Sequence, residues 1–463
     1  MAMRSFLNGP SFSVPGGSME DNRPLRERYS SEITPEDFGT SVTVAGWLQD
    51  VRNLGGIAFL QLRDRGGVLQ VTAIKKEMGE DGFRELVELP RESVITVTGT
   101  IQENNQAKAG FEVLPSSWEL LSQAEVPLPL GVVDKVGADL DTRLDNRFMD
   151  VRKPEVAAIF RLRSILTNGL RRSLVDQGFI EVATPKIVSA GAEGGATLFK
   201  LDYFGKPAYL AQSPQLYKQH LMASGLDRVF EVAPAFRAEP SDTSRHLAEF
   251  TSLDVEQAYV RTSEDVMATV ERMTVDGVRY MIEEGQELLD LLLVRLDVPP
   301  QPFRRIPYDE CIEMLRGDDV DVPEGAEMGT EHEKALGQLV HQRWGEDYYF
   351  ITDFPTRYKV GTFYAHRYED RPELTGYFDL GVRGQEIASG GKREHRLEVV
   401  TAQMEQGGLR PADFEFYLKA FRYGMPPHGG FGYGVERLLQ MLLGLPNIRE
   451  TVLYPRDRQR LVP

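Results

Sequence analysis

The sequence predicts an α+β protein, in which a small N-terminal β-barrel precedes a larger domain with a largely antiparallel sheet flanked by helices. Two observations predict this fold. Five short alternating runs are typical of β-strands, and an OB-fold barrel has that strand count: residues 41–51, 57–63, 68–74, 94–101 and 110–114. Beyond residue 150, strands and helices mix without a regular β-α-β repeat, which favours an antiparallel sheet.

Composition divides the chain into parts of different character. The expected parts are a flexible N-terminal extension (1–28), an OB-fold domain (29–125), a proline-rich hinge (126–150) and the larger domain (151–463). The larger domain opens on a helix at 154–176, where apolar residues recur at helical spacing, and it contains a helical insertion at about 262–345. For the first domain, a plain β-sandwich remains an alternative to the barrel.

Charge and cysteine content limit the classes of protein to which the chain can belong. The single cysteine, Cys311, excludes an intrachain disulfide and is typical of a reducing compartment. Asp290 and Arg295 interrupt the richest apolar stretch, so we expect no membrane span and a cytoplasmic protein. The net charge of −17 argues against general affinity for nucleic acid, although a local basic groove on an acidic body would still bind it specifically.

The segment 236–256 predicts a β-hairpin with side chains suited to a nucleotide. Its polar and aromatic candidates are Arg237, Glu239, Arg245, His246, Phe250, Asp254 and Glu256. Strand alternation puts the last three on one face and turns Leu253 and Val255 away. Arginine binds phosphate through a planar fork and phenylalanine stacks on a base, which favours a nucleotide site. A surface hairpin with salt bridges is the alternative.

The segment 429–437 combines four glycines with the start of a helix. Glycine lets the backbone approach a ligand closely. Arg437 is expected in the first helical turn, where backbone N–H groups favour anions. The segment is not a P-loop, because no Gly-Lys-Ser/Thr follows, and it is not a dinucleotide fingerprint. A glycine-rich strand that only packs is the alternative.

The segment 212–219 predicts the start of a helix that carries a ligand-binding face. Ser213 suits the N-cap and Pro214 the first helical position. Gln215 and Lys218 are then three residues apart on one face, where together they suit a small ligand bearing a carboxylate. A solvated lysine is the alternative.

Two carboxylates near residue 380 are candidate Mg²⁺ ligands. Asp379 and Glu386 offer the hard oxygens that this ion prefers beside phosphates. Their odd separation would put them on opposite faces of an unbroken strand, so a bulge or turn at 383–384 is required for them to meet. Two solvated carboxylates on a surface strand are the alternative.

In this order along the chain, the four segments resemble motifs of class IIb aminoacyl-tRNA synthetases, and specifically the archaeal-type branch of the aspartyl-tRNA synthetases. Residues 154–185 are similar to motif 1, which forms the family's dimer interface. Residues 236–256 are similar to motif 2 and residues 432–437 to motif 3, while 212–218 and 389–393 are similar to aspartyl-specific signatures. The resemblance spans about residue 28 to the C-terminus. It implies an aspartate–tRNA ligase that uses ATP and Mg²⁺, binds tRNA and forms a homodimer.

The resemblance also implies residue roles. The catalytic residues are Arg237 and Arg437. The ATP site comprises Arg237, Ala238, Glu239, Arg245, His246, Leu247, Phe250, Glu386, Gly434, Val435, Glu436 and Arg437. The aspartate site comprises Glu193, Gln215, Lys218, Arg237, Asp254, Ser389 and Arg393, and the Mg²⁺ ligands are Asp379, Glu386 and Ser389. Within these sets, Lys218 and Arg393 clamp the side-chain carboxylate of aspartate.

The reaction implied by this resemblance has a clear physical requirement. The α-carboxylate of aspartate is already a nucleophile at neutral pH, so the site has to supply positioning and positive charge, not a general base. Asparagine would place an amide NH₂ group against Lys218 and Arg393, so that donors face donors. Such a buried mismatch discriminates strongly.

The first domain is expected to read the tRNA anticodon. Phe59 and Gln61 share a strand face, and an exposed aromatic ring there makes a stacking platform. The resemblance implies anticodon contacts at Gln49, Arg52, Phe59, Gln70, Lys108 and Glu112. Members of the family strict for tRNA-Asp tend to have Gln or Trp and then Lys at the positions of Gln49 and Lys108, whereas relaxed members have His and Pro. We therefore expect a strict enzyme, with a non-discriminating one as the alternative.

Four other classes of protein are rivals. An ATP-dependent asparagine-making paralogue would lack the anticodon domain expected at residues 29–125. An asparaginyl-tRNA synthetase would lack the lysine that follows Ser-Pro-Gln, which is Lys218 here. A lysyl-tRNA synthetase would need acidic groups around the amino acid. An RNA-binding protein with an inactive catalytic domain would not need an intact set of Arg237, Glu386, Arg393 and Arg437.

Overall fold

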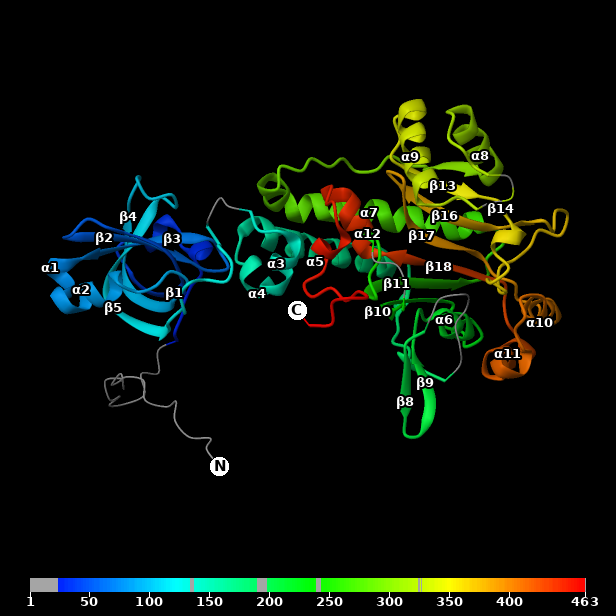
Figure 1. Cartoon of the computed structure of the whole chain (residues 1–463), viewed down its shortest axis with the longest axis horizontal. Coiled ribbons are helices and arrows are strands. Elements are labelled where there is room, and N and C mark those ends of the chain that lie inside the picture. The colour runs from blue at the N-terminus through cyan, green and yellow to red at the C-terminus, as the bar shows by residue number, and fades with distance from the viewer. Residues whose placement is uncertain are drawn as a thin grey trace. The chain divides into compact units, whose positions relative to one another are not determined.

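The computed structural model of the chain describes residues 24–133, 137–189, 198–238, 243–323, 325 and 327–462. The chain divides into two compact units, residues 1–137 and 138–463 (Figure 1). The boundary falls within the segment predicted as a hinge. Among the residues that the structure describes, no helix is long and apolar enough to cross a membrane.

The first unit is a closed five-stranded barrel with the strand order β1-β2-β3-β5-β4. Its strands are β1 (Ser41–Asn53), β2 (Ile57–Arg63), β3 (Val68–Ile74), β4 (Val94–Glu103) and β5 (Phe111–Ser122). Helices α1 (Lys75–Met78) and α2 (Glu80–Val87) connect β3 to β4. Alternate side chains of the strands, such as Leu60, Leu62 and Val71, fill the interior. The predicted barrel is confirmed, and the sandwich alternative is wrong.

Two of the last residues of the expected N-terminal extension, 1–28, are hydrogen-bonded to the barrel. Residues 1–23 lie outside the described part of the chain. Residues 26 and 27, expected within a flexible extension, are instead hydrogen-bonded to β1. The Arg26 guanidinium donates to the carbonyl of Ala45 at 2.7 Å, and the amide N–H of Glu27 donates to the carbonyl of Thr43 at 2.8 Å. Gly, Pro and Ser content does not reveal such attachments, because they depend on the partner strand.

The second unit is built on an eight-stranded sheet with the order β12-β13-β16-β17-β18-β11-β10-β6 (Figure 1). The strands are β6 (Ile180–Glu181), β10 (Arg228–Phe236), β11 (Glu249–Ala258), β12 (Arg304–Pro307), β13 (Tyr348–Thr352), β16 (Tyr377–Val382), β17 (Gln385–Lys392) and β18 (His428–Gly434). The two outermost pairs are parallel and all inner pairs are antiparallel. The predicted α+β class with a largely antiparallel sheet is confirmed.

Helices flank this sheet. They are α3 (Leu140–Asp145), α4 (Arg147–Asp150), α5 (Pro154–Asp176), α6 (Gln215–Met222), α7 (Ser263–Leu291), α8 (Tyr308–Gly317), α9 (Thr330–Trp344), α10 (Leu397–Gln406), α11 (Glu415–Arg422) and α12 (Val435–Leu443). Helices α5, α7 and α12 share the main hydrophobic core with the sheet. Helix α5 has the bounds that its apolar spacing predicts.

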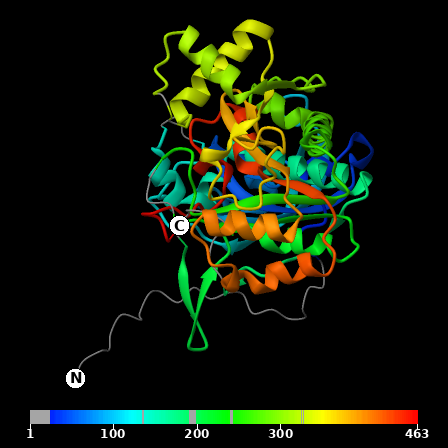
Figure 2. The same ribbon diagram turned by 90° about the vertical axis from the view of Figure 1, so that its right-hand side faces the viewer.

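Smaller strands complete the second unit. One sheet joins β7 (Ile187–Val188), β8 (Lys200–Tyr203) and β9 (Lys206–Leu210), and the β8–β9 hairpin projects away from the large sheet in both views (Figures 1 and 2). A second pairs β14 (Phe354–Pro355) with β15 (Leu374–Thr375).

The segment predicted as a helical insertion, 262–345, belongs partly to the fold itself. Helix α7 contributes buried side chains such as Val270 and Met281 to the main core. Strand β12 joins the edge of the large sheet beside β13. Helices α8 and α9 pack in a second hydrophobic cluster, which also includes Ile306 of β12 and Tyr349 of β13 and in which Cys311 is buried. Helical spacing predicted α7 well, but it does not reveal what a helix packs against.

Candidate active site

A pocket of about 300 Å³ opens over the strands β11, β17 and β18. It is lined by Ser213, Gln215, Arg237, Arg245, His246, Leu247, Phe250, Ser252, Asp254, Tyr364, Tyr377, Glu386, Ile387, Ser389, Gly432, Tyr433, Gly434, Glu436, Arg437 and Ile448. The four segments selected from the sequence therefore converge on one pocket. Its volume is that of a small-molecule site.

Cationic side chains gather on the predicted nucleotide side of the pocket. The Arg237 guanidinium lies over the ring of Phe250, 5.1 Å from its centroid. Arg437 stands in the first turn of α12, as predicted, and donates to the backbone carbonyl of Glu386 at 3.1 Å. Arg245 lies 3.9 Å from the carboxylate of Glu333 on α9. Three guanidiniums in a partly enclosed pocket make it suited to a polyphosphate.

Alternation along β11 places side chains as the sequence predicts. Leu253 and Val255 enter the main core, whereas Phe250 and Asp254 line the pocket. Glu256 is fully buried on the same face as Asp254. The strand thus carries both the floor of the pocket and the acidic groups next to it.

Lys218 and Arg393 meet at a single carboxylate. Lys218 Nζ lies 3.6 Å from Glu256 Oε2, and Arg393 Nε donates to Glu256 Oε1 at 3.1 Å. Lys218 Nζ also donates to Asp254 Oδ1 at 3.0 Å. All four side chains are at least nine-tenths buried, next to the pocket and in contact with its floor through Asp254. The two cations predicted to clamp a ligand carboxylate are therefore brought together.

One guanidinium nitrogen of this cluster has no hydrogen-bond partner among the described residues. Arg393 Nη2 donates to the carbonyl of Gly430 at 2.8 Å and Nε binds Glu256, but the buried Nη1 binds nothing. An unpaired buried donor on a charged group is costly, so such an atom indicates a missing acceptor. Arg393 also lies 5.2 Å from the ring centroid of Tyr364, which lines the pocket. A ligand carboxylate would fit this vacant donor.

The glycines of β18 have a more specific role than the one expected from the sequence. Gly430 lies opposite Glu256 in β11 and opposite Gly391 in β17. A Cβ atom at Gly430 would stand 2.2 Å from Glu256 Oε2 and 2.1 Å from the carbonyl oxygen of Val255. Gly430 is therefore needed because a side chain there would collide with the Glu256 carboxylate, which binds Lys218 and Arg393. Close approach of the backbone to a ligand, the role expected from the sequence, does not explain this glycine.

The turn required between Asp379 and Glu386 is present. Arg383 and Gly384 both have positive φ values, 51° and 77°, and they join β16 to β17 as a two-residue hairpin turn. Register then pairs Asp379 with Ser389, and the Ser389 hydroxyl donates to the Asp379 carboxylate. Glu386 and Ser389 line the main pocket, while Asp379 lines a small adjoining cavity that also contains Glu386.

Carboxylates crowd this end of the pocket. Burial raises the pKa of Asp379 to about 6 against the opposing charge of Lys359, and Glu386 adds to the rise. Burial also raises the pKa of Glu333 to about 7, helped by Glu386 and Asp379. No group of three or more His, Cys, Asp or Glu side chains in the described ranges is arranged to hold a metal ion alone. Mg²⁺ commonly binds one or two carboxylates plus substrate phosphates, and the donors here fit that mode.

Several predicted residues are placed elsewhere or lie beyond the description. Glu193 and Glu239 lie outside the described residues. Val435 is in the main core; Glu436 does line the pocket, but its carboxylate accepts from Arg163 at 2.7 Å. Ala238 is half-buried, beside Arg237. The N-cap of α6 is Pro214, not Ser213, so the helix starts one residue later than predicted. The Ser213 hydroxyl still accepts a hydrogen bond from the backbone N–H of Gln215 at 3.1 Å.

The sequence did not single out four residues that now matter for the site. They are Lys359 beside Asp379, and the lining residues Tyr364, Tyr377 and Ile448. They come from separate segments, so nothing in the local pattern marks them. Glu256 was a candidate on the predicted strand face, but its role as the bridge between Lys218 and Arg393 was not predicted.

In the barrel, the predicted anticodon residues form a row across neighbouring strands. Arg52 in β1 pairs with Phe59 in β2, and Gln70 in β3 pairs with Glu112 in β5, where the Gln70 side chain donates to Glu112 at 2.9 Å. All four lie on the face opposite the barrel core. Gln49 stands at a bulge of β1, and Lys108 is exposed in the β4–β5 loop. The row has the polar and aromatic character of a single-strand binding face.

Comparison with known proteins finds a matching family model for each of the two units. Residues 139–458 match the family model "tRNA synthetases class II (D, K and N)", and residues 42–121 match "OB-fold nucleic acid binding domain". The chain is 48% identical to the aspartate–tRNA(Asp) ligase of Pyrococcus furiosus, over 95% of this chain and all of the relative. It is 47% identical to the aspartate–tRNA(Asp/Asn) ligase of Methanothermobacter thermautotrophicus, over 95% of this chain and 98% of the relative.

A solved structure shows the same fold over nearly the whole chain. The asparaginyl-tRNA synthetase of Pyrococcus horikoshii, complexed with asparaginyl-adenylate, superposes with a TM-score of 0.87 and 33% identity, covering 95% of this chain and all of that one. The matched models, the near-full-length relatives and the converging motifs agree. The chain belongs to the class II aminoacyl-tRNA synthetases, and within them to the aspartate–tRNA ligase family.

Proposed function

We propose that the chain activates L-aspartate with ATP to aspartyl-adenylate and transfers the aspartyl group to the 3′ end of tRNA-Asp. The observation that carries the choice of amino acid is the Lys218–Glu256–Arg393 cluster with its vacant Nη1 donor. Two buried cations beside a polyphosphate-binding pocket suit a dicarboxylic amino acid. The relatives named as aspartate–tRNA ligases support the same choice.

The residues of the pocket divide the work of the first step. Arg393 and Lys218 hold the aspartate side chain, so that its α-carboxylate faces the nucleotide. That carboxylate attacks the α-phosphorus of ATP, a new C–O–P bond forms, and pyrophosphate leaves. Arg237 offsets the charge that develops on the phosphoryl oxygens, Arg245 and His246 hold the outer phosphates, and Phe250 and Arg437 lie on opposite sides of the base.

Glu386 and Ser389, with Asp379 alongside, would hold Mg²⁺ beside these cations, where it would neutralise phosphate charge. In the second step the terminal ribose hydroxyl of tRNA attacks the adenylate carbonyl, and AMP leaves. The side chains that hold the aspartate throughout both steps are Lys218 and Arg393. They would therefore also set the choice between aspartate and asparagine.

Pyrophosphate exchange with each amino acid tests the proposal. Aspartate is expected to drive ATP–pyrophosphate exchange, whereas asparagine and lysine are expected to be weaker by about 10³-fold or more, because the amide NH₂ group of asparagine or the side-chain ammonium group of lysine would face Lys218 and Arg393. Exchange driven by asparagine or lysine in preference to aspartate would overturn the choice of substrate.

Strictness toward tRNA-Asp is the finer part of the proposal. Relatives of both kinds, tRNA(Asp) and tRNA(Asp/Asn) ligases, match the chain at nearly equal identity. Gln49 and Lys108 are the residues that favour the strict kind, and both lie on described parts of the barrel unit. The exposed amine of Lys108 is free to reach a nucleotide.

A Lys108→Pro variant is expected to charge tRNA-Asn relative to tRNA-Asp about ten times better than the unmodified protein, because a contact that discriminates one base is worth roughly 1–3 kcal/mol. Charging assays on the two purified tRNAs measure this ratio. Lys76→Ala, which removes another exposed lysine of the barrel unit, serves as the control and should leave the ratio unchanged. If the Lys108→Pro variant charged the two tRNAs in the same ratio as the unmodified protein, Lys108 would not be a residue that makes the enzyme strict for tRNA-Asp.

We also propose that the chain acts in the cytoplasm as a homodimer joined through the segment similar to motif 1. The large apolar side chains of Val175, at the end of α5, and Ile180, in β6, are exposed. Exposed apolar residues at this segment suit burial against a second copy.

A further inference from the structure

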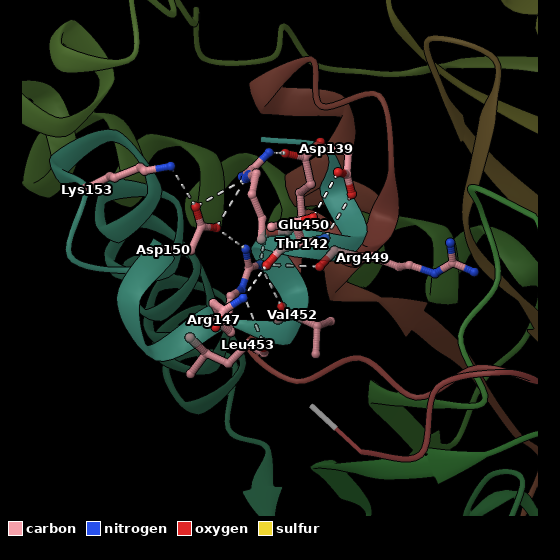
Figure 3. Close-up of polar contacts among 11 residues, drawn as sticks. Asp139, Thr142, Arg147, Asp150, Lys153, Arg449, Glu450, Val452 and Leu453 are labelled. Atoms are coloured by element: carbon pink, nitrogen blue, oxygen red, sulfur yellow. Dashed lines mark hydrogen bonds and ion pairs between the residues drawn. The ribbon is translucent and has the colours of Figure 1, made fainter. Parts of the chain in front are cut away.

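A buried network joins the first helices of the second unit to the C-terminal segment (Figure 3). We call residues 447–460, which follow α12, the C-terminal strap. Arg147 on α4 is 1% exposed and directs its guanidinium to strap carbonyls: Leu453 at 3.2 Å, Val452 at 2.9 Å, Glu450 at 3.3 Å and Arg449 at 3.4 Å. Its remaining nitrogen donates to Asp150 at 2.8 Å.

Side chains around Arg147 strengthen the same junction. Arg143 bridges the two sides, since it contacts Asp150 at 3.2 Å and the strap residue Glu450 at 3.0 Å. Farther along the strap, Arg460 pairs with Asp145 on α3. The strap is closed on itself by an ion pair of 2.8 Å between Arg449 and Asp457. Helices α3 and α4 therefore hold the strap at both of its ends.

The C-terminal strap is in turn hydrogen-bonded to the segment that carries Arg245 and His246, the side chains expected at the outer phosphates of ATP. The backbone N–H of Ile448 donates to the carbonyl of Ser244 at 2.9 Å, and the backbone N–H of Ala248 donates to the carbonyl of Arg456 at 2.7 Å. These two hydrogen bonds bracket residues 245–247. All three of those residues line the pocket, as does Ile448 itself.

We propose that Arg147 is a positioning residue for ATP, which acts through the C-terminal strap to hold Arg245 and His246 at the outer phosphates. The inference rests on the proposed function. Arginine suits the task because its planar fork has five donors, enough to bind several carbonyls and a carboxylate together, whereas lysine has three donors on one atom. A shift of about 1 Å in a positioning group is enough to reduce binding and rate strongly.

The aspartate end of the pocket does not depend on the same junction. Lys218 stands on α6, Glu256 on β11 and Arg393 directly after β17, and their contacts are with one another and with β18. Loosening the strap should therefore weaken the binding of ATP selectively. A residue that only stabilised the fold would not distinguish the two substrates.

Pyrophosphate exchange with the full chain separates these cases. Arg147→Lys and the less buried Asp457→Asn are expected to raise KM for ATP about tenfold or more while KM for aspartate stays within about twofold. Arg304→Lys is the matched control, because Arg304 also makes a two-pronged ion pair, with Glu346 at 2.9 and 2.8 Å, but contacts neither strap nor pocket. Both KM values should be unchanged in that variant.

Two further measurements test whether Arg147 affects ATP binding through Arg245 and His246. In an Arg245→Ala/His246→Ala background, Arg147→Lys should raise KM for ATP no further, because both side chains on which it acts are already absent. Titration of each variant with a non-hydrolysable ATP analogue gives the ATP affinity without any amino acid, so the inference is tested even if aspartate is not the substrate. Equal KM changes for both substrates, or a lowered melting temperature with unaltered ATP affinity in Asp457→Asn, would overturn the inference.

Discussion

Replacement of Arg393 with lysine is expected to lower kcat/KM for aspartate by about a hundred- to a few thousandfold while KM for ATP changes little. The guanidinium bonds Glu256 and Gly430 and keeps Nη1 for a ligand, and a lysine cannot meet all three demands. Breaking a buried ion pair on one side costs about 3–5 kcal/mol, which converts to roughly this factor. Pyrophosphate exchange over a range of aspartate concentrations measures the loss.

The control for this variant lies three residues away. Arg396→Lys makes the same change in a guanidinium that binds Glu394 through two nitrogens, both at 2.8 Å, at a partly exposed position outside the pocket lining. It should retain activity. If Arg393→Lys lost less than about tenfold in kcat/KM for aspartate, Arg393 would not be a principal ligand of the substrate.

Removal of the Arg237 side chain should lower kcat by about a hundred- to a thousandfold, the usual loss when one group that stabilises transition-state charge is deleted. Arg237 lies over Phe250 inside the pocket, between the predicted positions of ATP and aspartate. Because its role is at the reacting phosphate, the fall in kcat should exceed the rise in KM for ATP. Single-turnover formation of the adenylate measures this step directly.

Arg228→Ala is a matched control for Arg237→Ala. Arg228 begins β10, the strand that ends directly before Arg237, and it also lies over an aromatic ring, 5.5 Å from the centroid of Phe179, but it is exposed and away from the pocket. Its loss should leave kcat within about twofold. A fall in kcat of similar size in both variants would show that Arg237 matters to the strand and not to the chemistry.

Sequence pattern predicted local elements well and their partners less well. The period-2 runs predicted the barrel strands, and the odd spacing of Asp379 and Glu386 predicted the turn at 383–384, because each follows from backbone geometry. Helix α7 was expected in an insertion, yet it packs in the main core. The helical spacing of apolar residues indicates that a helix has an apolar face, but it does not indicate which other element packs against that face.

The candidate site shows the same division. Resemblance selected many of the residues that line the pocket, but the bridge from Lys218 to Arg393 through Glu256 depends on the register of β11, β18 and β17. That register puts Gly430 where any side chain would collide with Glu256. The junction of Arg147 with the strap joins residues about 300 positions apart, which no local pattern reveals.

The proposal that Lys218 and Arg393 bind the side-chain carboxylate of the substrate is tested most directly by a crystal structure of the protein with a non-hydrolysable aspartyl-adenylate analogue. The aspartate side-chain carboxylate is predicted to lie within about 3 Å of both Arg393 Nη1 and Lys218 Nζ, the distance of a charge-assisted hydrogen bond. An analogue bound with that carboxylate elsewhere, while Arg393 Nη1 still had no partner, would contradict the account.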